Sequence, residues 1–287
     1  MSVAPLHPDR IVFQSARVTV GEWRCPRTHP LFADSGPIER HLVAFPRTSA
    51  VIRHAGRSGF VADARLATVY NRGQRYTREA VHPDGDRCDW WAVDPDTARE
   101  IAASVDRHAG TDDDAPLRFA HAPVEATLYA RQRSLLLRIR SGAIDTLAAE
   151  EAVVALWHDT VAAGARAAGS ARATPSRGSR EVAEAAAREL AASWQDAHTL
   201  DSLSRGLGVS PFHLCRSFRA AMGRTLHRQL TLLRLRAALE ALSEGGSDLT
   251  QVALAHGFSS HSHFSYAFRR EFGLTPSQWR AQPRAIS

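Results

Sequence analysis

The sequence contains no lysine, so all 36 of its basic residues are arginine. Arginine differs from lysine because it offers a planar fork of donors to a phosphate or to a guanine edge. Cysteine is also scarce, and Cys25, Cys88 and Cys215 lie too far apart for the disulfide framework of a small secreted domain. No run approaches the roughly 18 apolar residues of a membrane span, and residues 1–9 lack the apolar centre of a signal peptide. We therefore expect a cytoplasmic protein without a membrane partner.

The rest of the composition is that of a globular chain with room for two domains. Its 287 residues are 44% hydrophobic and 23% charged, with a net charge of +6. Residues from 180 onward contain 13 arginines and 9 acidic residues, so the C-terminal third is slightly more basic than the remainder. This mild excess favours a nucleic-acid partner for that third.

Residues 10 to 122 form a series of short segments rich in β-branched and aromatic residues, separated by turns. The segments are Ile11–Cys25, His41–Pro46, Ala50–Gly56, Gly59–Ala64, Leu66–Asn71 and Cys88–Val93. This pattern predicts a β-sandwich or a barrel. Helical patterns follow at 94–108, 123–140 and 145–168, and the last two could pack on this domain or against a second copy. We expect an α+β protein whose first domain, residues 1–168, is a cupin-like β-barrel with a helical hairpin.

Residues 169–179, GSARATPSRGS, are small and polar and form the clearest linker of the chain. The domain expected after it, residues 180–287, has only helical patterns. These patterns cover 179–197, 199–207, 210–221, 225–243, 248–255 and 260–272.

Two segments of this all-α region repeat one another. Leu203, Gly208 and Val209 correspond to Val252, Gly257 and Phe258. One residue later in register, Leu214, Phe218, Gly223 and Thr225 correspond to Phe264, Phe268, Gly273 and Thr275. Each unit combines a short helix, a glycine turn and a longer helix, which is the helix-turn-helix arrangement.

The repeated region resembles the AraC/XylS family of bacterial transcription regulators. The resemblance covers about residues 180–283 and rests on LDSLSRGLGVSPFHLCRSFRAAMGRT and QVALAHGFSSHSHFSYAFRREFGLTPSQWR. It implies two helix-turn-helix units, rigidly joined by a long helix, that enter successive major grooves on one face of promoter DNA. The segment before the linker, with FPR, VADA, YNRGQ and GDRCDWWAV, is similar to the β-barrel sensing and dimerisation domain of the family. The resemblance further implies an effector and, for an activator, RNA polymerase as a partner; activator and repressor both stay open.

The resemblance also indicates which side chains would contact DNA. Those expected to face the bases are Phe212, Cys215, Arg216, His261, Ser262, Ser265 and Tyr266, and those expected to neutralise phosphates are Arg219, Arg224, Arg269 and Arg270. Arg216 is the best candidate for reading guanine, since a guanidinium can bridge the two acceptors of that base. Tyr266 stands where family members often carry arginine. The second unit is therefore expected to contact phosphates more than it reads bases.

The first domain gives weaker indications of a site. The aromatic residues Tyr70, Tyr76, Trp90 and Trp91 could line an effector pocket, and nothing in the sequence names the ligand. Cys25, His29 and Cys88 have side chains that zinc prefers, with a fourth ligand from His41, His54 or His82. A β-barrel metalloenzyme or metal sensor fused to a DNA-binding domain is therefore the alternative. The domain has no H-x-H pair, nucleophile elbow or glycine-rich phosphate loop, so we expect neither an enzyme nor a cofactor.

Overall fold

The computed structural model describes residues 7–34, 36–106, 115–169, 176–244 and 248–282, and these residues form two compact units. The first unit takes in the described residues from 7 to 169 together with residue 282, and the second takes in those from 176 to 281. Helix α3 ends at Gly169 and helix α4 begins at Arg177, so the predicted linker begins and ends on helical residues, while residues 170–175 lie outside the described part. Among the described helices, none combines the length and the apolar character of a membrane span.

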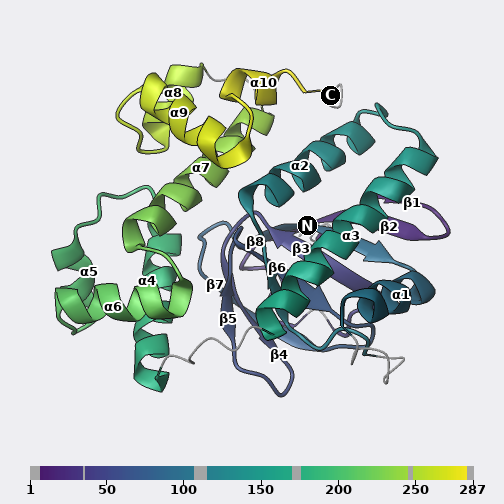
Figure 1. The fold of residues 1–287 in the computed structure, drawn as a ribbon, viewed down its shortest axis with the longest axis horizontal. Helices are drawn as coiled ribbons and strands as arrows, with labels where there is room; N and C mark the ends of the chain where they lie inside the picture. Colours follow the sequence, from purple (N-terminus) through teal and green to yellow (C-terminus); the bar gives the residue numbers. More distant parts are fainter. Residues whose placement is uncertain (1–6, 35, 107–114, 170–175, 245–247, 283–287) are drawn as a thin grey trace, which may run out of the picture. The chain divides into compact units, whose positions relative to one another are not determined.

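Two antiparallel sheets make up the β part of the first unit (Figure 1). The larger sheet has six strands in the order β1-β2-β8-β3-β6-β9, and the smaller has three in the order β5-β4-β7. Their bounds are β1 Asp9–Gln14, β2 Val18–Cys25, β3 His41–Pro46, β4 Ala50–His54, β5 Phe60–Ala62, β6 Leu66–Tyr70, β7 Tyr76–Ala80, β8 Asp86–Val93 and β9 His121–Pro123.

The predicted β-barrel does not close, and its cupin-like form is not confirmed. Within the described residues the strand ladders end at β1 and β9 in one sheet and at β5 and β7 in the other, so the two sheets stay separate. The predicted strand Ile11–Cys25 is also divided, because a turn with Ser15 Oγ accepting from Val18 N at 3.2 Å separates β1 from β2. The sequence patterns missed β7, which is polar, and β9, which has three residues.

The helices α1 Pro95–Val105, α2 Ala126–Arg140 and α3 Thr146–Gly169 match the three predicted helical segments, except that residues 107 and 108 lie outside the described part. Helix α3 packs on the larger sheet of its own unit. The indole of Trp157 donates to the carbonyl of Trp91 at 2.9 Å, and both side chains are fully buried. At Gly164 a Cβ would lie 2.1 Å from the ring of Phe119, so this glycine permits the close packing.

The second unit consists of helices. They are α4 Arg177–Ala192, α5 Leu200–Gly206, α6 Pro211–Met222, α7 Leu226–Glu244, α8 Leu249–Ala255, α9 His261–Phe272 and α10 Pro276–Arg280. The predicted ends of α6 and α9 are confirmed, whereas α4 ends at Ala192, before the predicted residue 197. Ser210 and Ser260 cap α6 and α9 through their side chains, and Gly223 and Gly273 end the same helices in the left-handed conformation.

Candidate functional site

The second compact unit, residues 176–281, contains two helix-turn-helix units. Helices α5 and α6 form the first, and α8 and α9 form the second. The turns contain Gly208 and Gly257, with φ values of 65° and 76° that favour glycine. Leu214 and Phe218 bury one side of α6, and Phe264 and Phe268 bury the matching side of α9. Each longer helix therefore presents its opposite side to solvent, as a recognition helix does.

The exposed side of α6 carries Phe212, Cys215, Arg216 and Arg219. Phe212 is 75% exposed, which is unusual for a large apolar side chain. The guanidinium of Arg216 lies over its ring, 6.0 Å from the centroid. An aromatic ring and a guanidinium fork thus stand together near the start of this helix, where recognition helices meet base edges.

The exposed side of α9 has a different chemistry. Tyr266 is 67% exposed, and the guanidinium of Arg270 lies 5.7 Å from the centre of its ring. His261 Nε2 and Ser265 Oγ are 3.3 Å apart and half-buried, whereas Ser262 and Arg269 are exposed. Arg224, on the turn after α6, is half-buried, and its Nε donates to the carbonyl of Met222 at 3.4 Å.

Arg234, in the middle of α7, joins the segment before the first helix-turn-helix unit to the turn of the second, and the sequence analysis missed it. Its Nε and Nη2 donate to the carbonyls of Trp194 and Asp196, which lie between α4 and α5, at 3.0 and 2.9 Å. Its Nη1 donates to the carbonyl of Gly257 in the turn of the second unit, at 3.3 Å. One side chain therefore bridges backbone from both halves of the domain.

Further contacts strengthen the same connection. The Trp194 indole and the His256 imidazole are stacked, with centroids 5.5 Å apart. Arg228 of α7 forms an ion pair with Glu271 of α9, and the indole of Trp279 donates to Ser243 Oγ at 3.0 Å. The long helix α7 is thus joined by side-chain contacts to α9 and α10, and through Arg234 to the segment between α4 and α5.

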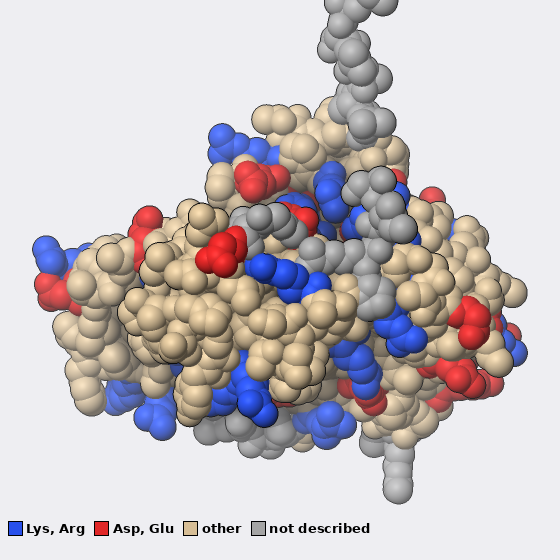
Figure 2. Space-filling view, turned by 90° about the horizontal axis from the view of Figure 1, so that it is seen from above, with Lys and Arg blue, Asp and Glu red and all other residues tan. Residues whose placement is uncertain are grey.

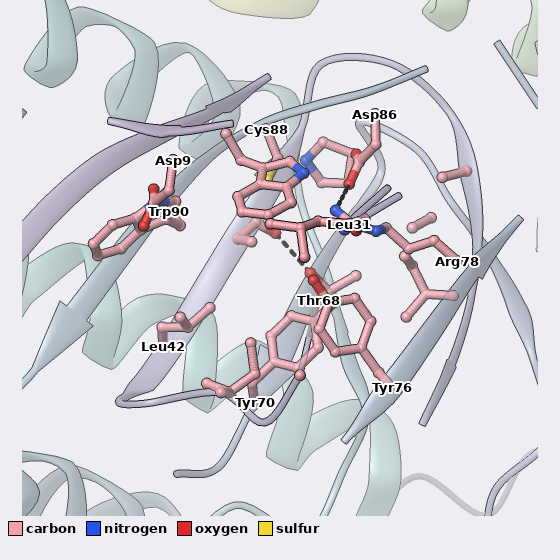
Figure 3. A pocket seen from close by; sticks show the side chains of 18 of the residues that line it. Asp9, Leu31, Leu42, Thr68, Tyr70, Tyr76, Arg78, Asp86, Cys88 and Trp90 are labelled. Carbon is pink, nitrogen blue, oxygen red and sulfur yellow. Dashed lines mark hydrogen bonds and ion pairs between the residues drawn. The ribbon is translucent and has the colours of Figure 1, made fainter. Parts of the chain in front are cut away.

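A cavity of about 280 Å³ lies in the first unit, between its two sheets (Figure 3). The larger sheet contributes Trp23, Leu42, Thr68, Tyr70, Cys88 and Trp90 to its wall, and the smaller sheet contributes Ala50, Ile52, Ala62, Tyr76 and Arg78. The wall is mainly apolar, with a few polar groups directed inward, as in small-molecule sites.

Comparison with protein families identifies the second compact unit. A family model described as a helix-turn-helix domain matches residues 203–282. A crystal structure of a transcriptional regulator from Chromobacterium violaceum, described as having an AraC-type DNA-binding domain, is 32% identical. The match covers 37% of this chain and 94% of that one, with a TM-score of 0.35. The chain belongs to the AraC/XylS family.

Two curated regulators match a stretch of similar length. The HTH-type transcriptional regulator GlxA of Rhizobium meliloti is 40% identical over 79 residues, which are 28% of this chain and 24% of GlxA. The HTH-type transcriptional activator RhaR of Salmonella dublin is 33% identical over 91 residues, which are 32% of each chain. This AraC/XylS chain therefore matches a quarter to a third of the length of these relatives.

Trp91 does not line the cavity of this AraC/XylS protein, although Tyr70, Tyr76 and Trp90 do. Side chains of successive strand residues point to opposite faces, so Trp90 and Trp91 cannot share one. Trp91 instead lies fully buried on the face of β8 that packs against α3.

The zinc hypothesis finds no support in the geometry. In the parts of the chain that the structure describes, no three His, Cys, Asp or Glu side chains are grouped so that they could hold a metal ion, and Cys25, His29 and Cys88 are therefore not brought together. Burial raises the pKa of the Cys25 thiol and raises that of Cys88 well above its usual range. Without a metal ion, both shifts favour the neutral thiol.

One face of the molecule shows no charge pattern that would by itself outline a DNA-binding surface (Figure 2). On the face drawn in Figure 2, arginine side chains are interspersed with Asp and Glu and do not form one continuous basic patch. The assignment of an interface therefore depends on the geometry of the recognition helices and on the side chains they expose.

Proposed function

We propose that this protein regulates transcription by binding promoter DNA in a sequence-specific manner through both helix-turn-helix units. The observation that supports this most is the pair of exposed recognition helices, α6 and α9, in a domain where Arg234 of the long helix α7 joins the segment before α5 to the turn between α8 and α9. Two recognition helices with a fixed relative orientation can enter successive major grooves together. If they could rotate freely, binding would cost the conformational entropy of fixing them.

The proposed contacts divide into base-reading and phosphate-binding groups. Arg216 bridges the two acceptors of a guanine edge, and Phe212 contacts a thymine methyl group. Cys215 is a small neutral neighbour of both. In the second helix-turn-helix unit, the residues of α9 that face the bases are His261, Ser262, Ser265 and Tyr266. The phosphate contacts are Arg219, Arg224, Arg269 and Arg270.

Selection of binding sites from a random DNA pool by the full-length protein tests this function. We expect enriched sequences with two blocks, spaced by about one helical turn, roughly 10 base pairs. The Arg216→Ala variant should lose the preference at one position of one block. Enrichment of no sequence, or of a single block that survives when α9 is altered, would contradict binding by both units.

We further propose that residues 1–168 form the sensing and dimerisation domain, that 169–179 link it to the DNA-binding domain at 180–287, and that a small-molecule effector occupies the cavity. The name of RhaR describes a transcriptional activator. By analogy, an activator role with RNA polymerase as the partner is our preferred form of the proposal. A homodimer would double the number of DNA contacts. Footprinting at a selected promoter, with and without candidate metabolites, tests the effector response.

A further inference from the structure

The cavity contains two pairs of a carboxylate and an indole, Asp86 with Trp23 and Asp9 with Trp90. In the first pair the guanidinium of Arg78 contacts both members. At one end, Arg78 lies 4.5 Å from the ring centre of Trp23 and 5.4 Å from that of Tyr76. Its Nη1 donates to Asp86 at 2.8 Å, and its Nη2 and Nε donate to the carbonyls of Leu31 and Phe32, each at 2.8 Å. The charge of Arg78 is thus balanced by the protein itself.

Asp9 and Trp90 form the second pair, on the opposite side of the view in Figure 3 from Arg78 and Asp86. The indole of Trp90 donates to Asp9 Oδ1 at 2.7 Å. Within the described residues Asp9 takes part in no ion pair; the nearby Arg40 pairs with Glu39 at 3.6 Å, and His7 Nδ1 accepts from the backbone N–H of Asp9. A half-buried carboxylate beside an aromatic face therefore lacks the cation that Asp86 has.

The position of Trp90 is built into the sheet. A Cβ on Gly21, the residue opposite Trp90 on β2, would lie 2.3 Å from the indole ring. Glycine at this position lets the indole cross β2 and reach Asp9 on the edge strand β1. The Asp9–Trp90 pair is therefore a defined part of the cavity wall and not a chance contact of two flexible side chains.

From these observations we infer that the cavity binds a small aromatic amine in its cationic form, with the ammonium group at Asp9 and the ring among Trp90, Tyr70 and Leu42. An ammonium gains from a carboxylate and from the face of an indole at once. A cavity of about 150 Å³ admits benzene, so about 280 Å³ has room for one ring with a short chain. A carboxylate ligand would meet Asp9 and Asp86, while the two arginines that line the described cavity, Arg78 and Arg40, are paired with Asp86 and Glu39. The inference assumes the proposed effector role of the cavity.

Binding of three probes that share one phenylethyl body tests the inference on the full-length protein. The probes are 2-phenylethylamine, 2-phenylethanol and 3-phenylpropanoate, and calorimetry gives the Kd of each. We expect the amine to bind about ten-fold more tightly than the alcohol, and the carboxylate to bind most weakly. The Asp9→Asn variant should bind the amine and the alcohol equally, while unchanged alcohol affinity would show that its cavity is intact.

The matched control is Asp84→Asn, which alters an exposed acid that does not line the cavity and should leave all three affinities unchanged. Tightest binding of the carboxylate, an amine preference that persists in Asp9→Asn, or no binding of any probe would overturn the inference. Failure of the proposed regulatory function would appear separately, as the absence of enriched sequences in the DNA selection.

Discussion

The two helix-turn-helix units have the same backbone plan but differ in both their cores and their exposed faces. Four positions of the first helix-turn-helix unit, the half-buried Val209 and Met222 and the buried Leu214 and Phe218, correspond to the buried Phe258, Phe272, Phe264 and Phe268 of the second. The four phenylalanines contact one another in sequence, with successive ring centroids 5.2, 5.5 and 4.6 Å apart. The second unit is thus held by a row of aromatic rings, and the first mainly by aliphatic side chains.

The exposed faces differ in the opposite sense. The first unit presents Arg216 where the second presents Tyr266, so the guanidinium fork expected to read guanine belongs to the unit with the aliphatic core. The comparison indicates that the capping residues and the buried positions maintain the fold of both helix-turn-helix units. The exposed residues differ between the two, so we expect each to make different DNA contacts. The following predictions test this separation, from the largest expected effect to the smallest.

Replacing the central ring of the aromatic row should have the largest effect. Phe268→Ala removes a fully buried ring that contacts Phe264 and Phe272, and we expect the free energy of unfolding to fall by about 3–5 kcal/mol. Urea denaturation measures this change. Tyr266→Ala, on the exposed side of the same helix, is the control and should change stability by less than about 0.5 kcal/mol. Equal effects would mean that core and face are not separate.

Removing the guanidinium of Arg216 should affect recognition and leave stability nearly unchanged. For Arg216→Ala we expect specific DNA binding to weaken by about 1–3 kcal/mol, with relaxed preference at one base pair. Titrations on a selected operator and on random DNA measure the difference. An equal loss on both DNAs would show that Arg216 contacts the backbone and does not read a base.

Loss of the Arg234 bridge should change how the two units cooperate. Arg234→Met removes three hydrogen bonds to carbonyls of both halves, and since the side chain is half exposed, water should limit the loss of stability to about 1–2 kcal/mol. Operators with one extra base pair between the blocks should then be tolerated better than by the wild-type protein. Arg205→Met, which breaks only an exposed pair with Asp201, should leave the spacing preference unchanged.

The salt dependence of binding can show whether both units contact phosphate. Arg219→Ala and Arg269→Ala should each reduce the slope of log K against log salt concentration by about one unit. Affinities at several salt concentrations give the slope. If only Arg269→Ala lowers it, Arg219 makes no phosphate contact, and the first unit has fewer such contacts than proposed.

A lower pH should reduce the stability of the second helix-turn-helix unit slightly more than that of the first. Burial lowers the pKa of His256 below its usual 6.5, so the folded protein favours the neutral imidazole. This contribution is complete above about pH 6.5 and is lost as the pH falls from there through the lower pKa of the folded state. Hydrogen exchange of the α8 amides at pH 7 and pH 5.5 measures the opening free energy. His256→Leu, which copies Leu207 of the first unit, should remove the pH dependence of this opening.

The local features of this protein could be predicted from its sequence, whereas the long-range ones could not. Ser210, Ser260, Gly223 and Gly273 define helix ends by contacts within a few residues, which is why α6 and α9 were located correctly. The insertion of β8 between β2 and β3 pairs residues far apart in the chain, and no periodicity reveals it. The failure to predict two open sheets follows from this limit.

The candidate sites divide in the same way. The exposed residues of α6 and α9 follow from helical spacing, and their roles on DNA stay predictions. Arg234 could not be recognised, since its partners are carbonyls 23 to 40 residues away, and carbonyls have no sequence signature. Adjacent Trp90 and Trp91 could have been separated by the alternation of a strand, which allows only one of them to face the cavity.

The exposed arginines of the recognition helices have one further consequence. Acetylation neutralises lysine in many proteins and so adjusts their affinity for DNA, but it has no target side chain in a sequence without lysine. A guanidinium also keeps its proton throughout the physiological pH range. Lysine-modifying enzymes therefore cannot change the positive charge of the recognition helices, which comes from Arg216, Arg219, Arg269 and Arg270.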